Sequence, residues 1–282
     1  MTIVALAATG EMGASIGRRI VQSGGRALAC IDGRSQASID RAKSAGVETG
    51  SFKNIIESSE VYLSIVPPGV AEQVADEFIN IAATASRVPI FIDCNAVAPV
   101  TLQRIAARFH AAGLIFGDGA IVGLPPISDG AGPRLYLSGN IVDAAVQLRG
   151  VGLDTRHMSR NLGDASALKM AYAGLTKGLQ ALAAGILCGA NDAKVLDALS
   201  AEVRQSLPGL FVFLSAALPR MPRKAGRWEH EMLEIATFLQ RDDGVATMFI
   251  GAAKTYRDVA TAQHTFSSVL PQLIDRFISS PS

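Results

Sequence analysis

The stretch "IVALAATGEMGASIGRRIVQSG" (residues 3–24) decides the fold, because it combines a strand pattern, a tight turn and a helix pattern in direct succession. Its apolar start predicts a buried strand, and the segment after the turn has the spacing of an amphipathic helix. Between them, Ala8, Gly10 and Gly13 have the spacing of a dinucleotide-binding turn. In such a turn the middle glycine lets the backbone approach a pyrophosphate, and the last lets helix and strand pack closely.

The helix that follows this turn offers free N–H groups and a positive dipole end, both of which favour phosphate binding. Ala8 replaces the usual first glycine, which is the smallest departure that a side chain allows. The alternative is a turn that serves packing alone. We expect cofactor contacts from Ala8, Thr9, Gly10, Glu11, Met12 and Gly13.

The second strand ends in "CIDGRS" (30–35), which carries a mixed signal for the choice of cofactor. An acidic residue at this place binds the ribose hydroxyls of NAD, whereas an arginine suits the 2′-phosphate of NADP. Asp32 and Arg34 are both present, and Ser35 adds a hydroxyl. Asp32 also precedes a glycine and fits a turn former or cap. The arginine favours NADP(H), with NAD(H) as the alternative.

Short apolar runs alternate with helical patterns through the first 160 residues. Near-continuous apolar strands separated by amphipathic helices predict a parallel sheet covered on both faces, in a doubly wound α/β fold. The predicted strands are 3–8, 26–32, 61–66, 88–95, 114–122 and 134–139. We therefore expect a Rossmann-type dinucleotide-binding domain over residues 1–160.

From residue 161 to the end, the sequence has only helical patterns, which predict an all-α domain that serves substrate binding and dimerisation. Asn191-Asp192 is expected to cap the second of these helices. The predicted helices are 164–190, 193–207, 228–240, 244–262 and 267–279.

Composition excludes several classes of partner. The 282-residue chain is 49% hydrophobic with a formal net charge of +1, so we expect neither nucleic acid nor a membrane surface as partner. The longest apolar run (209–218) is too short to span a bilayer, and the N-terminus lacks the features of a signal peptide. Cys30, Cys94 and Cys188 have no disulfide or metal spacing, so we expect a cytoplasmic protein without a metal site.

The stretch "GDASALKMAYAGLTKG" (163–178) begins the first helix of the second domain and carries Lys169 one residue off an apolar stripe. A lysine there can extend to solvent from the edge of a core helix, or its amine can titrate in a cleft. The stripe is expected to be the packing face of the helix, and it consists of Leu168, Tyr172, Leu175, Leu179, Leu182 and Ile186.

Five blocks in the same order resemble the β-hydroxyacid dehydrogenase superfamily, the relatives of 6-phosphogluconate dehydrogenase and 3-hydroxyisobutyrate dehydrogenase. The helical half looks most like a branch whose C-terminal domain is a domain of unknown function. The blocks are "ATGEMG" (8–13), "SIVPPGVAEQV" (64–74), "DCNAVAP" (93–99), "GDGAIVG" (117–123) and "GDASALKMAYAG" (163–174).

The resemblance implies an NAD(P)-dependent oxidoreductase that transfers hydride to or from a small hydroxy or keto acid or a semialdehyde. Lys169 takes the place of the family's general acid/base, and desolvation in a cleft would draw its pKa toward neutrality. Further implied cofactor contacts are Val66, Pro67 and Asn95, and implied substrate contacts are Asn95, Val122, Gly123 and Thr176.

Three substrate-facing positions depart from the family pattern, so the resemblance does not name the substrate. Asn95-Ala96 replaces a Ser-Thr pair, Val122-Gly123 remains of a Ser-Gly-Gly loop, and Ala173 replaces an asparagine. Asn95 is equally compatible with a plain strand-end turn.

Other readings stay open. An imine reductase on the same scaffold and a nucleotide-binding sensor without catalysis are the alternatives to a dehydrogenase. His230 and Glu234, one turn apart, fit a metal pair, a substrate contact or a solvated helix pair. Trp228 is expected to be a packing anchor. The apolar helical half predicts a homodimer formed through the second domain, as in the family.

Overall fold

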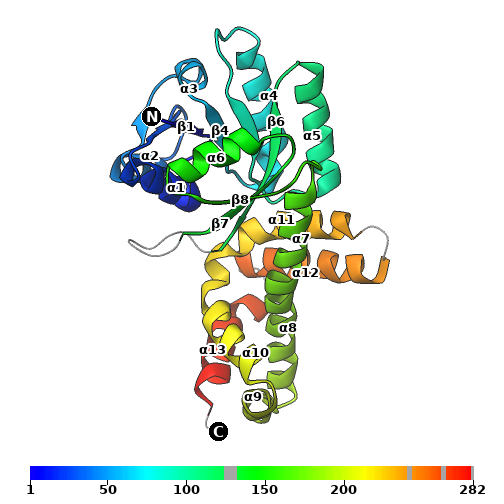
Figure 1. Cartoon of the computed structure of the whole chain (residues 1–282). Helices are drawn as coiled ribbons and strands as arrows, with labels where there is room; N and C mark the ends of the chain where they lie inside the picture. Colours follow the sequence, from blue (N-terminus) through cyan, green and yellow to red (C-terminus); the bar gives the residue numbers. More distant parts are fainter. Residues whose placement is uncertain (124–131, 240–242, 262–264, 281–282) are drawn as a thin grey trace. The chain divides into compact units, whose positions relative to one another are not determined.

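The computed structural model shows two compact units (Figure 1). The first unit spans residues Met1–Met170 and the second Ala171–Ser282. The structure describes residues 1–123, 132–239, 243–261 and 265–280.

The described residues of the first unit form an eight-stranded sheet in the order β3-β2-β1-β4-β5-β6-β7-β8. The strands are β1 (Ile3–Leu6), β2 (Arg26–Ala29), β3 (Glu48–Thr49), β4 (Val61–Ser64), β5 (Ile90–Asp93), β6 (Phe116–Val122), β7 (Arg134–Ser138) and β8 (Asp154–Ser159). The predicted doubly wound α/β fold is confirmed. The expected parallel pairing is wrong for β7, which runs antiparallel to β6, because residues 123–133 are fewer than the roughly one dozen that a parallel crossover needs.

Helices cover both faces of this sheet. They are α1 (Glu11–Gln22), α2 (Gln36–Ser44), α3 (Phe52–Ser58), α4 (Ala71–Ala82), α5 (Pro99–Ala111) and α6 (Val142–Gly150). A 3₁₀ turn, η1 (Pro68–Val70), precedes α4, and α7 (Asp164–Ala173) begins in the first unit. Sequence reasoning missed the short β3 and α3, as well as α6 and β8.

Alternate residues of each central strand are buried on opposite sides of the sheet. On one side, Val4 and Leu63 pack with Ile20 of α1. On the other side, Tyr62 packs in a cluster of aromatic rings with Phe78 of α4. Burial on both faces explains why these strands have continuous apolar sequences rather than alternating ones.

The second unit contains helices and connecting turns throughout its described residues. A single π-helical turn, η2 (Gly174–Gly178), follows α7. The remaining elements are α8 (Leu179–Asp192), α9 (Leu196–Ser206), α10 (Pro208–Ala217), η3 (Leu218–Arg220), η4 (Pro222–Lys224), α11 (Ala225–Phe238), α12 (Asp243–Thr261) and α13 (Thr265–Ser279). None of the helices in the described ranges is long and apolar enough to cross a membrane.

Three details of the helical unit differ from expectation. Asn191-Asp192 belongs to the last turn of α8 and does not cap the next helix, which begins at Leu196 after Lys194 takes a positive φ of 61°. The apolar run 209–218 lies almost wholly within α10, a helix that the sequence pattern did not predict. The predicted 164–190 helix is interrupted by the π turn at Gly174–Gly178.

Candidate dinucleotide-binding and proton-transfer site

The glycine turn lies between the end of β1 and the start of α1. A Cβ at Gly13 would lie 2.1 Å from the Ala8 carbonyl oxygen, so only glycine fits there. A Cβ at Gly10 would meet no atom of the described chain within 4 Å. Gly10 precedes the first turn of α1, whose leading N–H groups have no partner within their own helix. The turn is therefore closed toward the protein at Gly13 and open at Gly10, as a phosphate cradle requires.

Two arginines bind the carbonyl groups of this turn. Arg34 Nη2 donates to the Ala7 oxygen at 3.0 Å, and Arg41 Nε donates to the Thr9 oxygen at 2.9 Å. Arg41 Nη2 also donates to Ser38 Oγ at 3.1 Å. Arg34 precedes α2 and Arg41 lies in its last turn, so the two cations join this helix and the segment before it to the glycine turn.

Sequence reasoning selected Arg34 but missed Arg41. A usable signal was the spacing of Ser38 and Arg41, which lie one turn apart on the helix that follows the second strand. Ser35 caps that helix, since its hydroxyl accepts a hydrogen bond from the Ser38 N–H. Asp32 is exposed, and the Cys30 thiol lies 3.6 Å from its carboxylate.

A cavity of about 260 Å³ lies beside these residues. Its lining includes Asp32 and Arg34 from the end of the second strand, together with the Tyr62 ring and Glu77. Burial raises the pKa of the Tyr62 phenol far above its ordinary value, so Tyr62 remains neutral at physiological pH. The cavity thus has a neutral aromatic wall and charged groups along another part of its lining.

Asn95 connects the ends of two neighbouring strands. Its Oδ1 accepts from the Val66 N–H at 2.6 Å, and its Nδ2 donates to Ser64 Oγ at 3.0 Å. The Asn95 N–H donates to Asp93 Oδ1, and the Asn95 side chain is buried. Asn95 therefore fixes the backbone before exposed Pro67, and its contact with cofactor or substrate stays a prediction.

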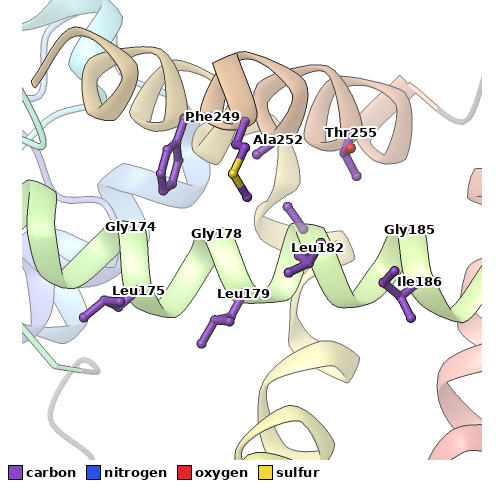
Figure 2. A pocket seen from close by; sticks show the side chains of 12 residues that line it. Gly174, Leu175, Gly178, Leu179, Leu182, Gly185, Ile186, Phe249, Ala252 and Thr255 are labelled. Carbon is purple, nitrogen blue, oxygen red and sulfur yellow. The ribbon is translucent and has the colours of Figure 1, made fainter. Parts of the chain in front are cut away.

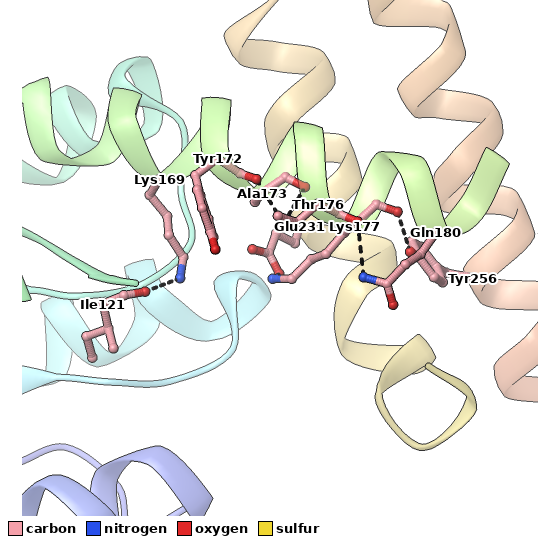
Figure 3. Close-up of polar contacts among 9 residues, drawn as sticks. All are labelled: Ile121, Lys169, Tyr172, Ala173, Thr176, Lys177, Gln180, Glu231 and Tyr256. Atoms are coloured by element: carbon pink, nitrogen blue, oxygen red, sulfur yellow. Dashed lines mark hydrogen bonds and ion pairs between the residues drawn. The ribbon is translucent and has the colours of Figure 1, made fainter. Parts of the chain in front are cut away.

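Lys169 lies on α7, and its amine donates to the carbonyl oxygen of Ile121 on β6 (Figure 3). The side chain is half-buried. The next residues of β6 are the predicted substrate contacts: Val122 is buried, and Gly123 is exposed with a φ of 124°. The structure thus brings Lys169 to the segment that holds these two residues.

Asp118, also on β6, is a buried carboxylate that sequence reasoning did not select. It accepts hydrogen bonds from Ser138, Gly163 and Ser166. Burial raises the pKa of Asp118, and the hydrogen bonds from Ser166, Ser138 and Gly163 oppose the rise. Four inward-pointing donors fit an ionised carboxylate, which accepts hydrogen bonds but donates none.

The second unit contains a separate buried ion pair. Lys177, in the π turn, donates to Glu231 of α11 and lies 5.3 Å from the centre of the Trp228 ring. The Tyr256 hydroxyl donates to the Lys177 carbonyl oxygen at 2.6 Å (Figure 3). The Tyr256 ring packs edge-on against Trp228. The expectation that Trp228 anchors packing is confirmed.

Thr176 also lies in the π turn, where its hydroxyl donates to the Tyr172 carbonyl oxygen at 2.8 Å. Its role as a substrate contact stays a prediction. His230 is exposed and Glu234 half-buried on α11. Over the described ranges, no three His, Cys, Asp or Glu side chains form a group that could hold a metal ion.

The apolar stripe expected to be a packing face is largely exposed. Leu175 is 71% exposed and Leu182 52%, and Tyr172, Leu179 and Ile186 are exposed as well. The inward face of this helix includes small residues such as Ala181 and Ala184, together with Gln180 and Leu187. Phe249 of α12 points toward Gly174 and Gly178 (Figure 2), where a Cβ at Gly178 would lie 2.9 Å from its ring.

An apolar hollow of about 440 Å³ lies between η2–α8 and α12 (Figure 2). Its lining includes Leu175, Leu182 and Ile186 from one side, and Met248 and Phe249 from the other. Met248 is also largely exposed, so apolar surface extends across both helices.

Comparison with known protein families gives two matches along the chain. Residues 3–97 match the family described as NADP oxidoreductase, coenzyme F420-dependent. Residues 190–259 match a domain of unknown function, DUF1932. No curated protein matches the sequence.

Several solved structures share the fold over nearly the whole chain. A conserved protein of unknown function, described as similar to 3-hydroxyacid dehydrogenases, is 26% identical, with a TM-score of 0.67 and coverage of 93% of this chain and 98% of that one. The 3-hydroxyisobutyrate dehydrogenase of Salmonella typhimurium is 16% identical, with a TM-score of 0.72 and coverage of 96% and 99%.

An imine reductase from Myxococcus stipitatus, solved with NADP+, is 19% identical, with a TM-score of 0.57 and coverage of 99% and 100%. A variant of that enzyme was solved with NAD+. The resemblance seen in the sequence is therefore confirmed. Residues 3–97 therefore resemble a family of NADP oxidoreductases and residues 190–259 resemble DUF1932, and the chain shares its fold with 3-hydroxyisobutyrate dehydrogenase.

Proposed function

We propose that this protein is an NADP(H)-preferring oxidoreductase that interconverts a small hydroxy acid and its keto acid or semialdehyde. The observation that carries the proposal is the hydrogen bond from the Lys169 amine to the Ile121 carbonyl oxygen on β6. The same sheet carries the glycine turn after β1, which has open space at Gly10. In open α/β sheets, ligands bind outside the carboxyl ends of the strands, and β1 to β6 place theirs along one edge.

The residues at this edge fit a dinucleotide. The N-terminus of α1 would hold the pyrophosphate, since Gly10 leaves space for it and Gly13 allows the tight turn. Arg34 and Arg41 favour a cofactor with an additional phosphate, because guanidinium groups pair with phosphate bidentately. The bound nicotinamide would supply hydride chemistry, as it does throughout this class of enzyme.

The part of the reaction assigned to this chain is the proton transfer at oxygen. Oxidation of an alcohol removes a hydride from carbon and a proton from the hydroxyl, and neutral Lys169 Nζ accepts that proton. In the reverse direction the Lys169 ammonium donates a proton to the carbonyl oxygen as it gains negative charge. The Ile121 carbonyl orients the amine, while Val122, Gly123, Asn95 and Thr176 remain the proposed substrate contacts.

Lys169→Ala tests this assignment. We expect loss of turnover with retained NADPH affinity, measured by fluorescence titration alongside a panel of hydroxy acids, keto acids, semialdehydes and imines. Lys254→Ala is the matched control, because Lys254 is exposed and pairs with Asp258 one turn along its own helix. Near-normal turnover in Lys169→Ala would contradict the assignment of proton transfer to Lys169.

The same panel separates the alternatives. Turnover of imines but not of carbonyl compounds would indicate the imine reductase. Cofactor binding with no turnover of any compound would favour a nucleotide sensor.

We further propose that the protein is a homodimer that pairs through the second unit. Exposed apolar surface on η2–α8 and α12, including Leu175, Leu182 and Met248, is more than scattered surface side chains account for. A second copy of the same face would cover it by two-fold symmetry. Light scattering at micromolar concentration tests the proposal, and a monomeric mass would refute it.

A further inference from the structure

The start of α7 is held by Asp118, a residue that the proposed proton transfer does not itself use. Asp118 Oδ2 accepts hydrogen bonds from Ser138 Oγ at 2.8 Å and from the Gly163 and Ser166 N–H groups at 3.1 and 3.0 Å. Asp118 Oδ1 accepts from Ser166 Oγ at 2.6 Å. Asp118 and Ser166 are buried, with exposed fractions of 0% and 1%.

The same helix contacts the same strand at a second point. Ser166 and Lys169 are three residues apart on α7 and therefore lie on one face of the helix. Ser166 bonds to Asp118, and Lys169 bonds to the carbonyl of Ile121, three residues further along β6. One helix face is thus attached to one strand at two sites about one helical turn apart.

The N-termini of α7 and α1 differ in what lies at their first N–H groups. Around the first turn of α7, the Gly163 and Ser166 N–H groups bond to Asp118, and the Ala165 N–H bonds to Ser138 Oγ at 3.1 Å. A carboxylate at this end also interacts favourably with the helix dipole. This N-terminus is therefore filled by protein groups, and its carboxylate sets where the helix begins and how it is rotated.

We propose that Asp118 is a positioning residue for Lys169: it fixes the first turn of α7 and thereby places the Lys169 amine at the Ile121 carbonyl. The inference rests on the proposed function of Lys169. Displacement of a reacting group by about 1 Å costs on the order of a hundredfold in rate, so a fixed helix start has a direct consequence for turnover.

Amine acylation of the full-length protein tests the placement without a substrate. Wild type and Asp118→Asn are treated with limiting acetic anhydride, and modification of each lysine is quantified by peptide mass spectrometry. We expect Lys169 to label about three- to tenfold faster in Asp118→Asn, the change that loss of one hydrogen bond produces. Exposed Lys254 provides the internal reference and should label equally in both proteins.

Two further variants keep the inference falsifiable if Asp118→Asn folds poorly. Ser166→Ala removes one donor to Asp118 and should change Lys169 labelling in the same direction by a smaller factor. Phe78→Leu, on α4 in the aromatic cluster that packs against the sheet, lowers stability away from α7 and should leave Lys169 labelling unchanged. Equal labelling of Lys169 in wild type, Asp118→Asn and Ser166→Ala would overturn the inference.

Turnover of whichever substrate the panel identifies completes the test. Asp118→Asn should lower kcat by roughly ten- to a hundredfold and shift its pH profile, with little change in cofactor affinity. Phe78→Leu should preserve the pH profile. An inactive Lys169→Ala beside an unaltered Asp118→Asn would contradict the positioning role alone, whereas an active Lys169→Ala would contradict the proposed function.

Discussion

The two units treat their apolar side chains in opposite ways. In the first unit, strand residues such as Val4, Leu63 and Ile92 are fully buried by helices of the same unit. In the second unit, Leu175 and Leu182 are more than half exposed, although they belong to an apolar stripe with the spacing of a packing face. The first unit therefore completes its own core, whereas the second leaves an apolar face of its described residues exposed.

The largest effect on cofactor binding and stability is expected from a substitution in the glycine turn of the first unit. Gly13→Ala places a Cβ 2.1 Å from the Ala8 carbonyl oxygen, so the start of α1 must shift. We expect loss of detectable NADPH binding in a fluorescence titration. Unfolding in urea should show destabilisation of about 1–3 kcal/mol, as for other overpacked sites.

Gly10→Ala is the matched variant, because a Cβ there meets no described atom within 4 Å and the backbone is extended. It should keep wild-type stability yet weaken NADPH binding by at least about tenfold, which corresponds to about 1.4 kcal/mol of binding free energy. Wild-type affinity in Gly10→Ala would mean that no cofactor approaches this turn.

The second expected effect concerns the exposed face of the helical unit. Leu175→Glu combined with Leu182→Glu places charges on this face, so a dimer formed through it should dissociate. Light scattering should give half the wild-type mass, with helical content by circular dichroism unchanged because both side chains are exposed. A dimer that survives both charges would place the interface elsewhere.

The difference between the buried strands of the first unit and the exposed apolar face of the second also explains how much of each unit the sequence predicts. Continuous apolar strands and the glycine spacing were enough for the central parallel strands and the turn after β1, since both patterns reflect burial inside the unit, but not for β3, β8 or the antiparallel direction of β7. The helical periodicity identified Leu175 and Leu182 as one face but not as an exposed one, because periodicity shows which residues share a face and not what covers it.

Residues that act through long-range contacts were not predictable in this way. Asp118 contacts Gly163 and Ser166, which lie more than 40 residues away in the chain. Arg41 donates a hydrogen bond to the Thr9 carbonyl oxygen, and α1 and β2 lie between these two residues in the sequence. The π turn at Gly174–Gly178 has no local signal beyond its glycines, which make room for Phe249.

A smaller effect sharpens the account of the cofactor. Arg41→Ala removes a cation beside the glycine turn, and we expect NADPH affinity to fall by about ten- to a hundredfold with little change for NADH. Paired titrations of the two reduced cofactors measure the difference. Lys43→Ala, on the same helix, is the control. Equal losses for both cofactors would assign Arg41 to the turn's structure rather than to phosphate recognition.

The smallest effect lies on the surface of the first unit. Arg104 and Arg108 hold the pKa of Glu72 below its ordinary value through hydrogen bonds and charge. A lowered carboxyl pKa stabilises the fold above the unfolded-state pKa, and this contribution is lost as pH falls through the folded-state pKa.

Glu72→Gln should therefore reduce the free energy of unfolding at neutral pH by at most about 1 kcal/mol, because Glu72 and both arginines are partly exposed. The difference from wild type should vanish in acid. Urea unfolding at both pH values checks the sign, and a difference that grows in acid would contradict it.

The most direct test of the central claim is a pair of titrations, NADPH and NADH, against the wild-type protein and Gly10→Ala. The account predicts saturable binding to wild type, tighter for NADPH than for NADH, and a clear loss of both in Gly10→Ala. If neither cofactor binds the wild-type protein, the glycine turn is a packing turn, and the oxidoreductase proposal fails together with the role of Lys169.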